Sequence, residues 1–405
     1  MPFQSRFAGW LTVERVRRHA MLLAVCIWGV YAFTLATPGL RDRTGKPKGT
    51  DFLHFYTLGS LAVEGRNDAL YDARVQADQS ERLVPESKGF HFLPVYGPQV
   101  ALLFSPLARL SYGWAALVWI SLSVLLYAWC CGAVWKTCPA LQQHRGPVAL
   151  LAVAYPAFFN LVAHGQTSAL ALFCFTAAYL ALGKKKPFLA GLAIGMLIYK
   201  PQLGLAAAFV FLFAREWKVV AGAILAAAAQ LAIAWAYFGR AVMETYWQVL
   251  NKLGESASVL EPKLFQMHSL RSFWMLLVPW EPVAHVLYMV TAALVLWWAF
   301  AAWRSRAPLS LRYSAFLLAT VLVTPHLTVY DLVILAPALL LLGDWALANA
   351  QHPASPSVRA LLYLGYALPL LGAVTQVTHV QLSVVAFAAL AWTMRQVLRP
   401  YESSA

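Results

Sequence analysis

The chain has 405 residues, of which 60% are hydrophobic and only 12% are charged, and its formal net charge is +14. Soluble domains carry charge on about a quarter of their residues, so this composition excludes an ordinary soluble protein and indicates an integral membrane protein. The apolar runs are continuous and lack the alternation of barrel strands. We therefore expect an all-α polytopic membrane protein.

Thirteen apolar runs are candidates for helices that cross the membrane. They lie at 20–37, 95–110, 112–135, 147–163, 166–182, 187–201, 203–214, 218–238, 283–303, 310–324, 327–343, 359–375 and 380–396. The run at 95–110 contains Pro98 and Pro106 and breaks the alternation of sides, so we expect it to be re-entrant or interfacial, unless the N-terminus is outside. The sequence predicts about 12 transmembrane helices, with a range of about 11 to 13.

Basic residues assign the sides of the membrane. Lys and Arg collect at alternate ends of the runs, as at Lys184–Lys186, which by the positive-inside rule makes these ends and both termini cytoplasmic. The positive charge therefore reflects topology and contact with membrane lipids of an anionic inner leaflet, and it gives no support for nucleic-acid binding. The five cysteines lie in or beside apolar runs and show no disulfide or zinc pattern, so we expect small apolar fillers.

The expected organisation is a cytoplasmic N-terminus at 1–19, a membrane domain at 20–345, and C-terminal transmembrane helices with a cytoplasmic tail at 346–405. The first run has no clear cleavage site, so we expect a retained span rather than a signal peptide. Two long external loops follow at 38–94 and 239–282. The first contains two expected amphipathic helices, Asp51–Arg66 and Ala73–Leu83, lying on the outer surface.

Unusual polar residues converge on the external side under this topology. They are Asp51, His54, His91, His164, Gln166, Lys200, Gln202, His268, Arg271, His326, Tyr330 and Asp331. A charged side chain at mid-membrane costs about 2.5–3.5 kcal/mol on insertion scales, so Lys200 and Asp331 should face a wet or paired interior. The convergence predicts a functional site between the external loops and the tops of the spans.

Each of these residues also has a structural interpretation. Asp51 can cap the helix that follows it, and Lys200 can extend its ammonium group to the membrane interface. His164, Gln166 and His326 can form hydrogen bonds between helices. Asp331 is expected to be a structural partner rather than a catalyst.

The order of several motifs resembles a known family. The motifs are Asp51-Phe-Leu-His-Phe-Tyr, Tyr71-Asp72, Tyr96-Gly97-Pro98, Leu102-Leu-Phe-Ser-Pro-Leu107, Gly165-Gln-Thr-Ser168, Ala190-Gly191, Lys200-Pro-Gln202, Thr324-Pro-His326 and Tyr330-Asp331. In this order they resemble glycosyltransferase family 87, the bacterial polyprenyl-phosphate-sugar-dependent transferases of the GT-C superfamily. The chain departs from the family pattern at Gly97 and at Met267-His268-Ser269, where the backbone path and the substrate contacts are therefore open.

The resemblance implies a GT-C-like helical bundle in the bacterial plasma membrane, with its active site on the external, periplasmic side. It implies transfer of a hexose, most often mannose, from a polyprenyl-monophosphate donor to a glycolipid or glycan acceptor, with inversion at the anomeric carbon. Such a transfer needs a base and cations for the departing phosphate. We assign Asp51 as base and Lys200 and His326 as phosphate contacts.

The remaining candidate residues are assigned to the sugar or the acceptor. They are His54, Tyr56, Gln166, Gln202, His268, Arg271 and Tyr330. No Asp-x-Asp or paired-carboxylate pattern is present, so we expect neither an obligatory metal nor a cofactor. Three alternatives stay open at this point: a lipid-linked sugar flippase or other transporter, an oligosaccharide polymerase or ligase that uses a lipid diphosphate, and a membrane scaffold.

Overall fold

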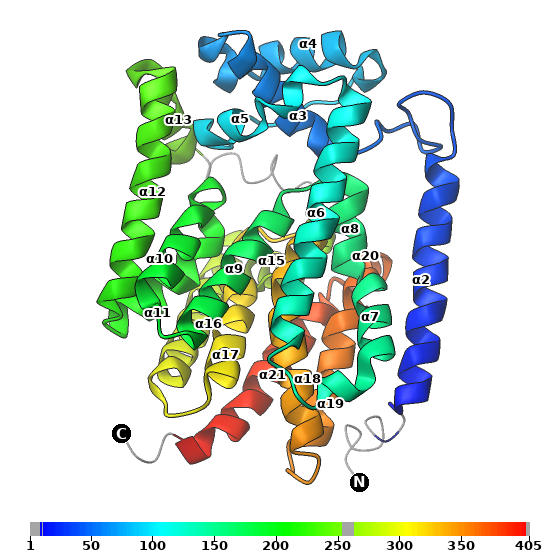
Figure 1. The fold of residues 1–405 in the computed structure, drawn as a ribbon, viewed down its shortest axis with the longest axis vertical. Coiled ribbons are helices and arrows are strands. Elements are labelled where there is room, and N and C mark those ends of the chain that lie inside the picture. The colour runs from blue at the N-terminus through cyan, green and yellow to red at the C-terminus, as the bar shows by residue number, and fades with distance from the viewer. Residues whose placement is uncertain (1–8, 10, 253–262, 402–405) are drawn as a thin grey trace.

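A computed structural model describes residues 9, 11–252 and 263–401 (Figure 1). Within these residues the chain is helical, and its β-structure is limited to two isolated bridges, Arg41 with Pro47 and Met267 with Thr328. The parts of the expected N-terminus, second external loop and C-terminal tail at 1–8, 10, 253–262 and 402–405 lie outside the described residues.

The helices form two layers. The smaller layer, which we call the cap, contains α3 (Thr50–Val63), η1 (Asn67–Tyr71), α4 (Ala73–Leu83), η2 (Pro85–Ser87), α5 (Pro98–Phe104), η3 (Leu107–Arg109) and α13 (Arg240–Lys252). It lies across one end of the larger layer, and the described ends of the chain lie toward the opposite end (Figure 1).

The larger layer is the membrane bundle. Its first half contains α2 (Val13–Leu35), α6 (Tyr112–Trp135), η4 (Leu141–His144), α7 (Arg145–Val153), α8 (Pro156–His164), α9 (Ser168–Gly183), α10 (Pro187–Gly195), η5 (Met196–Tyr199), η6 (Pro201–Gly204), α11 (Leu205–Phe213) and α12 (Trp217–Phe238). The second half contains η7 (Leu264–Gln266), α15 (Leu270–Leu277), α16 (Glu281–Arg304), α17 (Leu309–Val323), η8 (Val329–Leu335), α18 (Ala336–Ala348), α19 (Ser355–Ala367), η9 (Leu368–Leu370), α20 (Gly372–Thr378), α21 (Leu382–Leu398) and η10 (Arg399–Tyr401).

Five helices of the described chain are long and apolar enough to cross a membrane: α2, α6, α12, α16 and the combined η8–α18. The number becomes seven if each of two bent pairs is one span, the pairs being Leu141–Val153 with Pro156–His164, bent by 44°, and Ser355–Leu370 with Gly372–Thr378, bent by 83°. The chain is a polytopic helical membrane protein, and the expected number of 12 crossings is not confirmed.

Two of the expected spans are too short to cross as straight helices. The runs at Pro187–Tyr199 and Pro201–Phe213 are shorter apolar helices, and 13 residues extend only about 20 Å against a hydrocarbon core of roughly 30 Å. The two runs join at Lys200, which therefore lies in the break between η5 and η6. The candidate span at 95–110 is also not a transmembrane helix, because α5 has seven residues and belongs to the cap.

The cap has its own hydrophobic core, built around α3. Every residue from Phe52 to Ala62 is buried, and α3 packs with Phe104 of α5, Trp119 of α6 and Phe238 of α12 in one apolar cluster. The expectation of an amphipathic helix on the outer surface is therefore wrong for α3, because α4, α5 and the ends of α6 and α12 cover all of its faces. The expected helix at Ala73–Leu83 is confirmed as α4, which buries Gln76, Gln79 and Ser80 on one side only; its place on the outer surface stays a prediction.

Glycines allow α10 and α12 to pack at backbone distance. A Cβ at Gly191 would overlap the carbonyl of Val219, one at Gly195 would overlap the carbonyl of Ala223, and one at Gly222 would overlap the carbonyl of Phe188. Gly191 and Gly195 are four residues apart, as in the small-xxx-small motif. The hydrophobic effect does not drive helices together within lipid, so small residues that allow close backbone packing stabilise the contact instead.

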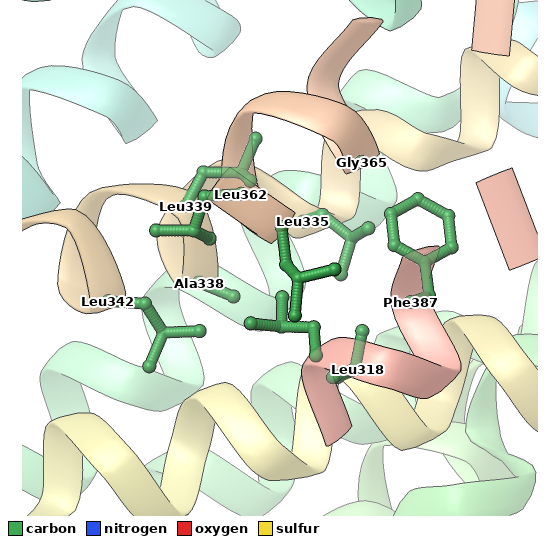
Figure 2. A pocket seen from close by; sticks show the side chains of 10 residues that line it. Leu318, Leu335, Ala338, Leu339, Leu342, Leu362, Gly365 and Phe387 are labelled. Carbon is green, nitrogen blue, oxygen red and sulfur yellow. The ribbon is translucent and has the colours of Figure 1, made fainter. Parts of the chain in front are cut away.

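The main core of the bundle is closely packed. A small cavity lies among Leu318, Leu335, Leu339 and Phe387 (Figure 2), lined by apolar side chains of α17, η8, α18, α19 and α21. Its volume is about 10 Å³. A space of this size is near the minimum for a single water molecule, so it is too small to be a substrate site.

We predict that Gly195→Leu destabilises the bundle by about 3 kcal/mol or more, because the new side chain forces α10 away from the backbone of α12. The measurement is thermal unfolding of purified protein in detergent. Gly132→Ala on α6 is the matched control, since a Cβ there meets nothing within 4 Å; it should be neutral or slightly stabilising. Equal unfolding temperatures for the two variants would contradict the close packing of α10 on α12.

Candidate active site

Asp51 lies in the first turn of α3, where the cap meets the bundle. The N-cap is Gly49, in a left-handed conformation with φ of 70°, and the helix has no side-chain cap. The Tyr112 hydroxyl fixes this turn by donating to the carbonyls of Lys48 and Gly49, at 2.7 and 3.1 Å. The alternative that Asp51 is a helix cap is therefore wrong, although the helix dipole still favours a negative charge at this position.

Gly165 ends α8 and brings the next residues against α3. Its φ is +66°, and a Cβ would lie 2.7 Å from the Cβ of Phe52, so both the backbone conformation and the close approach require glycine. Trp119 of α6 donates its indole N–H to the carbonyl of Gly165 at 2.9 Å and packs parallel to Phe52 at 6.5 Å between ring centroids. One helix, α6, thus holds both the start of α3 and the turn after α8.

This arrangement places Gln166 beside Asp51. The Gln166 side-chain N–H donates to Asp51 Oδ2 at 2.7 Å, while Gln166 Oε1 accepts the backbone N–H of Thr167 at 3.2 Å. Gln166 is 5% exposed, whereas Asp51 is half-buried. Because the side-chain amide of Gln166 uses both its N–H group and its oxygen in hydrogen bonds, its orientation is fixed. It therefore holds Oδ2 of Asp51 in place.

A buried ion pair lies on the other side of the same segment. Lys200 Nζ is 2.5 Å from Asp331 Oδ1, and the two side chains are 4% and 1% exposed. Ser168 donates to the same oxygen at 2.5 Å, and the backbone N–H and hydroxyl of Thr328 donate to Oδ2 at 3.3 and 3.2 Å. Asp331 is therefore a fully satisfied structural partner, and the alternative that Lys200 extends to the membrane interface is wrong.

Aromatic rings surround the two carboxylates. The Tyr330 ring lies 5.3 Å from Lys200 Nζ and 5.9 Å from the ring of His164. The hydroxyl of Tyr96 is affected by the charges of both Asp331 and Asp51. Burial raises the pKa of this hydroxyl, the two negative charges raise it further, and a hydrogen bond with the Gln166 side chain partly opposes the shift. The tyrosine consequently stays protonated and can donate a hydrogen bond.

Two candidate residues on α3 point into the cap rather than toward Asp51. The ring of His54 stacks on Phe92 at 4.9 Å and is 5% exposed. Tyr56 donates its hydroxyl to the carbonyl of Leu110 at 2.7 Å. His91, also expected at the site, is exposed.

The remaining candidates lie near the segment after α17. The backbone N–H of His268 donates to the carbonyl of Leu327 at 2.8 Å, and its Nδ1 lies 2.8 Å from Ser383 Oγ. His326 is half-buried in the same segment, as is Arg271 on α15. Gln202 is half-buried and accepts at its carbonyl from Thr324 at 3.4 Å.

Sequence reasoning missed Ser168, Thr328 and Tyr96 as parts of the site. Two of them lie within motifs used for the family resemblance, Ser168 after Gln166 and Tyr96 before Gly97. An uncharged side chain inside an apolar run gives no energetic signal of its own, so only the motif could have indicated them.

The described residues contain no group of three or more His, Cys, Asp or Glu side chains that could hold a metal ion. The expectation of transfer without an obligatory metal stays a prediction.

A model of glycosyltransferase family 87 matches residues 93–325, which are 233 of the 405 residues. The chain belongs to glycosyltransferase family 87. It is therefore a membrane glycosyltransferase, and the transporter and scaffold alternatives are set aside. No curated protein and no solved structure matches the chain.

The segment matched to family 87 includes Gln166, Lys200, His268 and Arg271 but ends one residue before His326. Asp51 precedes the segment, and Tyr330 and Asp331 follow it. The hydrogen bond from Gln166 to Asp51 and the ion pair from Lys200 to Asp331 therefore each join a matched residue to one outside the match.

We predict that Asp331→Asn lowers the free energy of unfolding by about 3–5 kcal/mol, because it leaves the charge of Lys200 buried and unpaired. Lys200→Met should also destabilise, since it leaves Asp331 with one donor fewer. The double variant should lose less than the sum of the two single losses. Thermal unfolding in detergent measures all three, and additive losses would show that the two side chains do not stabilise each other.

The buried imidazole of His54 predicts a loss of cap stability in acid. Burial lowers the pKa of His54 to about 4, with nearby Gln76 opposing in part, whereas the unfolded chain titrates near 6.5. Stability is therefore full above pH 6.5 and falls by up to about 3 kcal/mol as the pH is lowered toward 4. His54→Phe should make unfolding temperature less dependent on pH in this window; an unchanged slope would contradict the assignment. His268, with a pKa lowered to about 3 by burial, keeps its own contribution of the same sign in both proteins.

Proposed function

We propose that this glycosyltransferase moves a hexose, most simply mannose, from a polyprenyl-monophosphate donor to a glycolipid or glycan acceptor. The reaction is a single displacement with inversion at the anomeric carbon. The acceptor hydroxyl oxygen attacks that carbon, the bond from the carbon to the phosphate oxygen breaks, and Asp51 takes the hydroxyl proton.

One observation carries the role of Asp51. A carboxylate offers about four lone-pair positions to hydrogen-bond donors. Asp331 receives donors from Lys200, Ser168 and Thr328 and is fully buried. Asp51 receives one from Gln166 and is half-buried. Asp51 is thus held in position while keeping oxygen lone pairs with which to accept a proton, which is what a general base requires.

Lys200 and His326 are the proposed contacts of the departing phosphate. The Lys200 ammonium carries three N–H groups, and Asp331 is its carboxylate partner, so further N–H groups remain to donate to an anion. His326 lies, half-buried, in the neighbouring segment, which the hydrogen bond from His268 to Leu327 holds in place.

The other proposed contacts fall into two groups. Gln166, Gln202, Arg271, His268 and Tyr330 are proposed to contact the sugar or the acceptor near the junction of cap and bundle. His54 and Tyr56 are proposed to act indirectly, by shaping the cap beneath Asp51. We further propose a bacterial plasma membrane location with the cap on the periplasmic side, and catalysis without a metal.

Asp51→Asn should lower kcat for transfer from polyprenyl-phosphate-mannose by about 10²-fold or more, because an amide cannot take the proton. The assay uses purified protein and labelled donor, with unfolding temperature measured in parallel. Asp78→Asn is the matched control, since Asp78 is an exposed carboxylate on α4 of the cap; it should leave turnover unchanged. Wild-type turnover in Asp51→Asn would remove Asp51 as the base.

A panel of donors tests the substrate class. Labelled polyprenyl-monophosphate hexoses should be used in the presence of EDTA, whereas a polyprenyl-diphosphate oligosaccharide should not. Preference for the diphosphate would favour the polymerase or ligase alternative. The folded double variant Lys200→Met with Asp331→Asn should raise KM for the donor, and an unchanged KM would remove Lys200 as a phosphate contact.

A further inference from the structure

A large groove lies far from Asp51, toward the end of the bundle opposite the cap. Its volume is about 710 Å³, and it is formed by residues of α2, α6, α7, α18 and α19. It extends from Tyr155 and Phe158 in the interior to Trp135 at the C-terminal end of α6 and to His144 and Arg145 at the start of α7. This volume falls within the roughly 300–1,000 Å³ typical of small-molecule sites.

The interior walls of the groove are apolar. The hydroxyls of Tyr127, Tyr155 and Tyr366 donate to the carbonyls of Ala152, Leu332 and Leu151, at 2.9, 2.8 and 2.9 Å. Since these hydroxyls are already satisfied, the rings present only carbon to the space between them. This part of the groove suits hydrocarbon chains.

The open end of the groove is basic. His144, Arg145 and Arg359 line it, and no Asp or Glu is among the lining residues. Arg359 Nε is buried without a hydrogen-bond partner in the described part of the chain. The nearby carboxylate of Asp344 accepts from the backbone N–H of Leu141 at 3.1 Å and does not line the groove.

Arg359 as a whole is half-buried, and only its Nε is enclosed without a partner among the described residues, as is the Nε of Arg312 on α17. A buried N–H without a partner is costly, and Arg359, unlike Arg312, lines a groove with room for an anion. A phosphate diester suits two arginines, because guanidinium groups bind phosphate oxygens through paired N–H donors.

We propose that this groove binds one anionic glycerophospholipid of the leaflet opposite the cap. Its phosphate contacts Arg359 and Arg145, and its acyl chains lie along Tyr127, Tyr155 and Tyr366. His19 of α2 and Tyr363 of α19 are joined by a hydrogen bond of 3.0 Å, which closes one side of the groove. The lipid thus fills the space between α2 and the rest of the bundle, where α2 buries only Ala20.

The test uses the full chain purified in detergent and freed of lipid. Native mass spectrometry measures binding of phosphatidylglycerol and of phosphatidylcholine with the same acyl chains. We expect phosphatidylglycerol to bind about 10-fold more tightly, and we expect Arg145→Gln with Arg359→Gln to abolish this preference. Arg304→Gln, at the exposed end of α16, is the matched control and should retain it.

A second variant tests the acyl-chain part with the arginines intact. Gly132 lines the groove, and a Cβ there meets nothing within 4 Å, so Gly132→Phe should fold and should weaken binding of both lipids. Equal binding of the two lipids by the native protein, a retained preference in the arginine variant, or full displacement by inorganic phosphate would overturn the proposal. Asp51→Asn should bind lipid as the native protein does, which keeps this test separate from that of the transfer reaction.

Discussion

The carboxylate of Asp331 is the constraint on which the site depends. A charge inside an apolar bundle is tolerated only with full compensation, and Asp331 obtains it from Lys200, Ser168 and Thr328. These donors come from the break between η5 and η6, the start of α9 and the start of η8. Three segments that are distant in the sequence are thereby held at the carboxylate of Asp331. Gln166 lies two residues before Ser168, which is one of the donors to this carboxylate.

The cap and the bundle meet through a second set of contacts, which aligns the proposed base with this point. Tyr112 and Trp119 of α6 hold the turn before α3 and the turn at Gly165. The hydrogen bond between Gln166 and Asp51 then crosses from the bundle to the cap. The proposed base therefore lies on a helix, whereas the proposed phosphate contacts Lys200 and His326 lie in short turns between helices.

Composition and the order of motifs predicted the helical membrane class and the family, because apolar runs and ordered short motifs can be recognised in a single sequence. The cap helices α3 and α4 were predicted within a few residues. The burial of α3 was not, since a sequence does not show which elements cover a helix. Lys200 and Asp331 were each recognised as costly, but their pairing depends on how segments 131 residues apart in the sequence come together. The number of crossings stays a prediction, because short apolar helices and full spans have similar composition.

The composition of the cap core has a consequence for the order of biosynthesis. This core joins Phe52 of α3 to Ala234 and Phe238 of α12 and to Val242 of α13. The first cap segment therefore leaves the ribosome long before the residues that complete its packing, and α3 stays partly uncovered while α6 to α12 enter the membrane. Since an exposed apolar helix is prone to misassembly, the cap is the last part of this half of the chain to reach its final structure, and the proposed catalytic carboxylate is assembled with it.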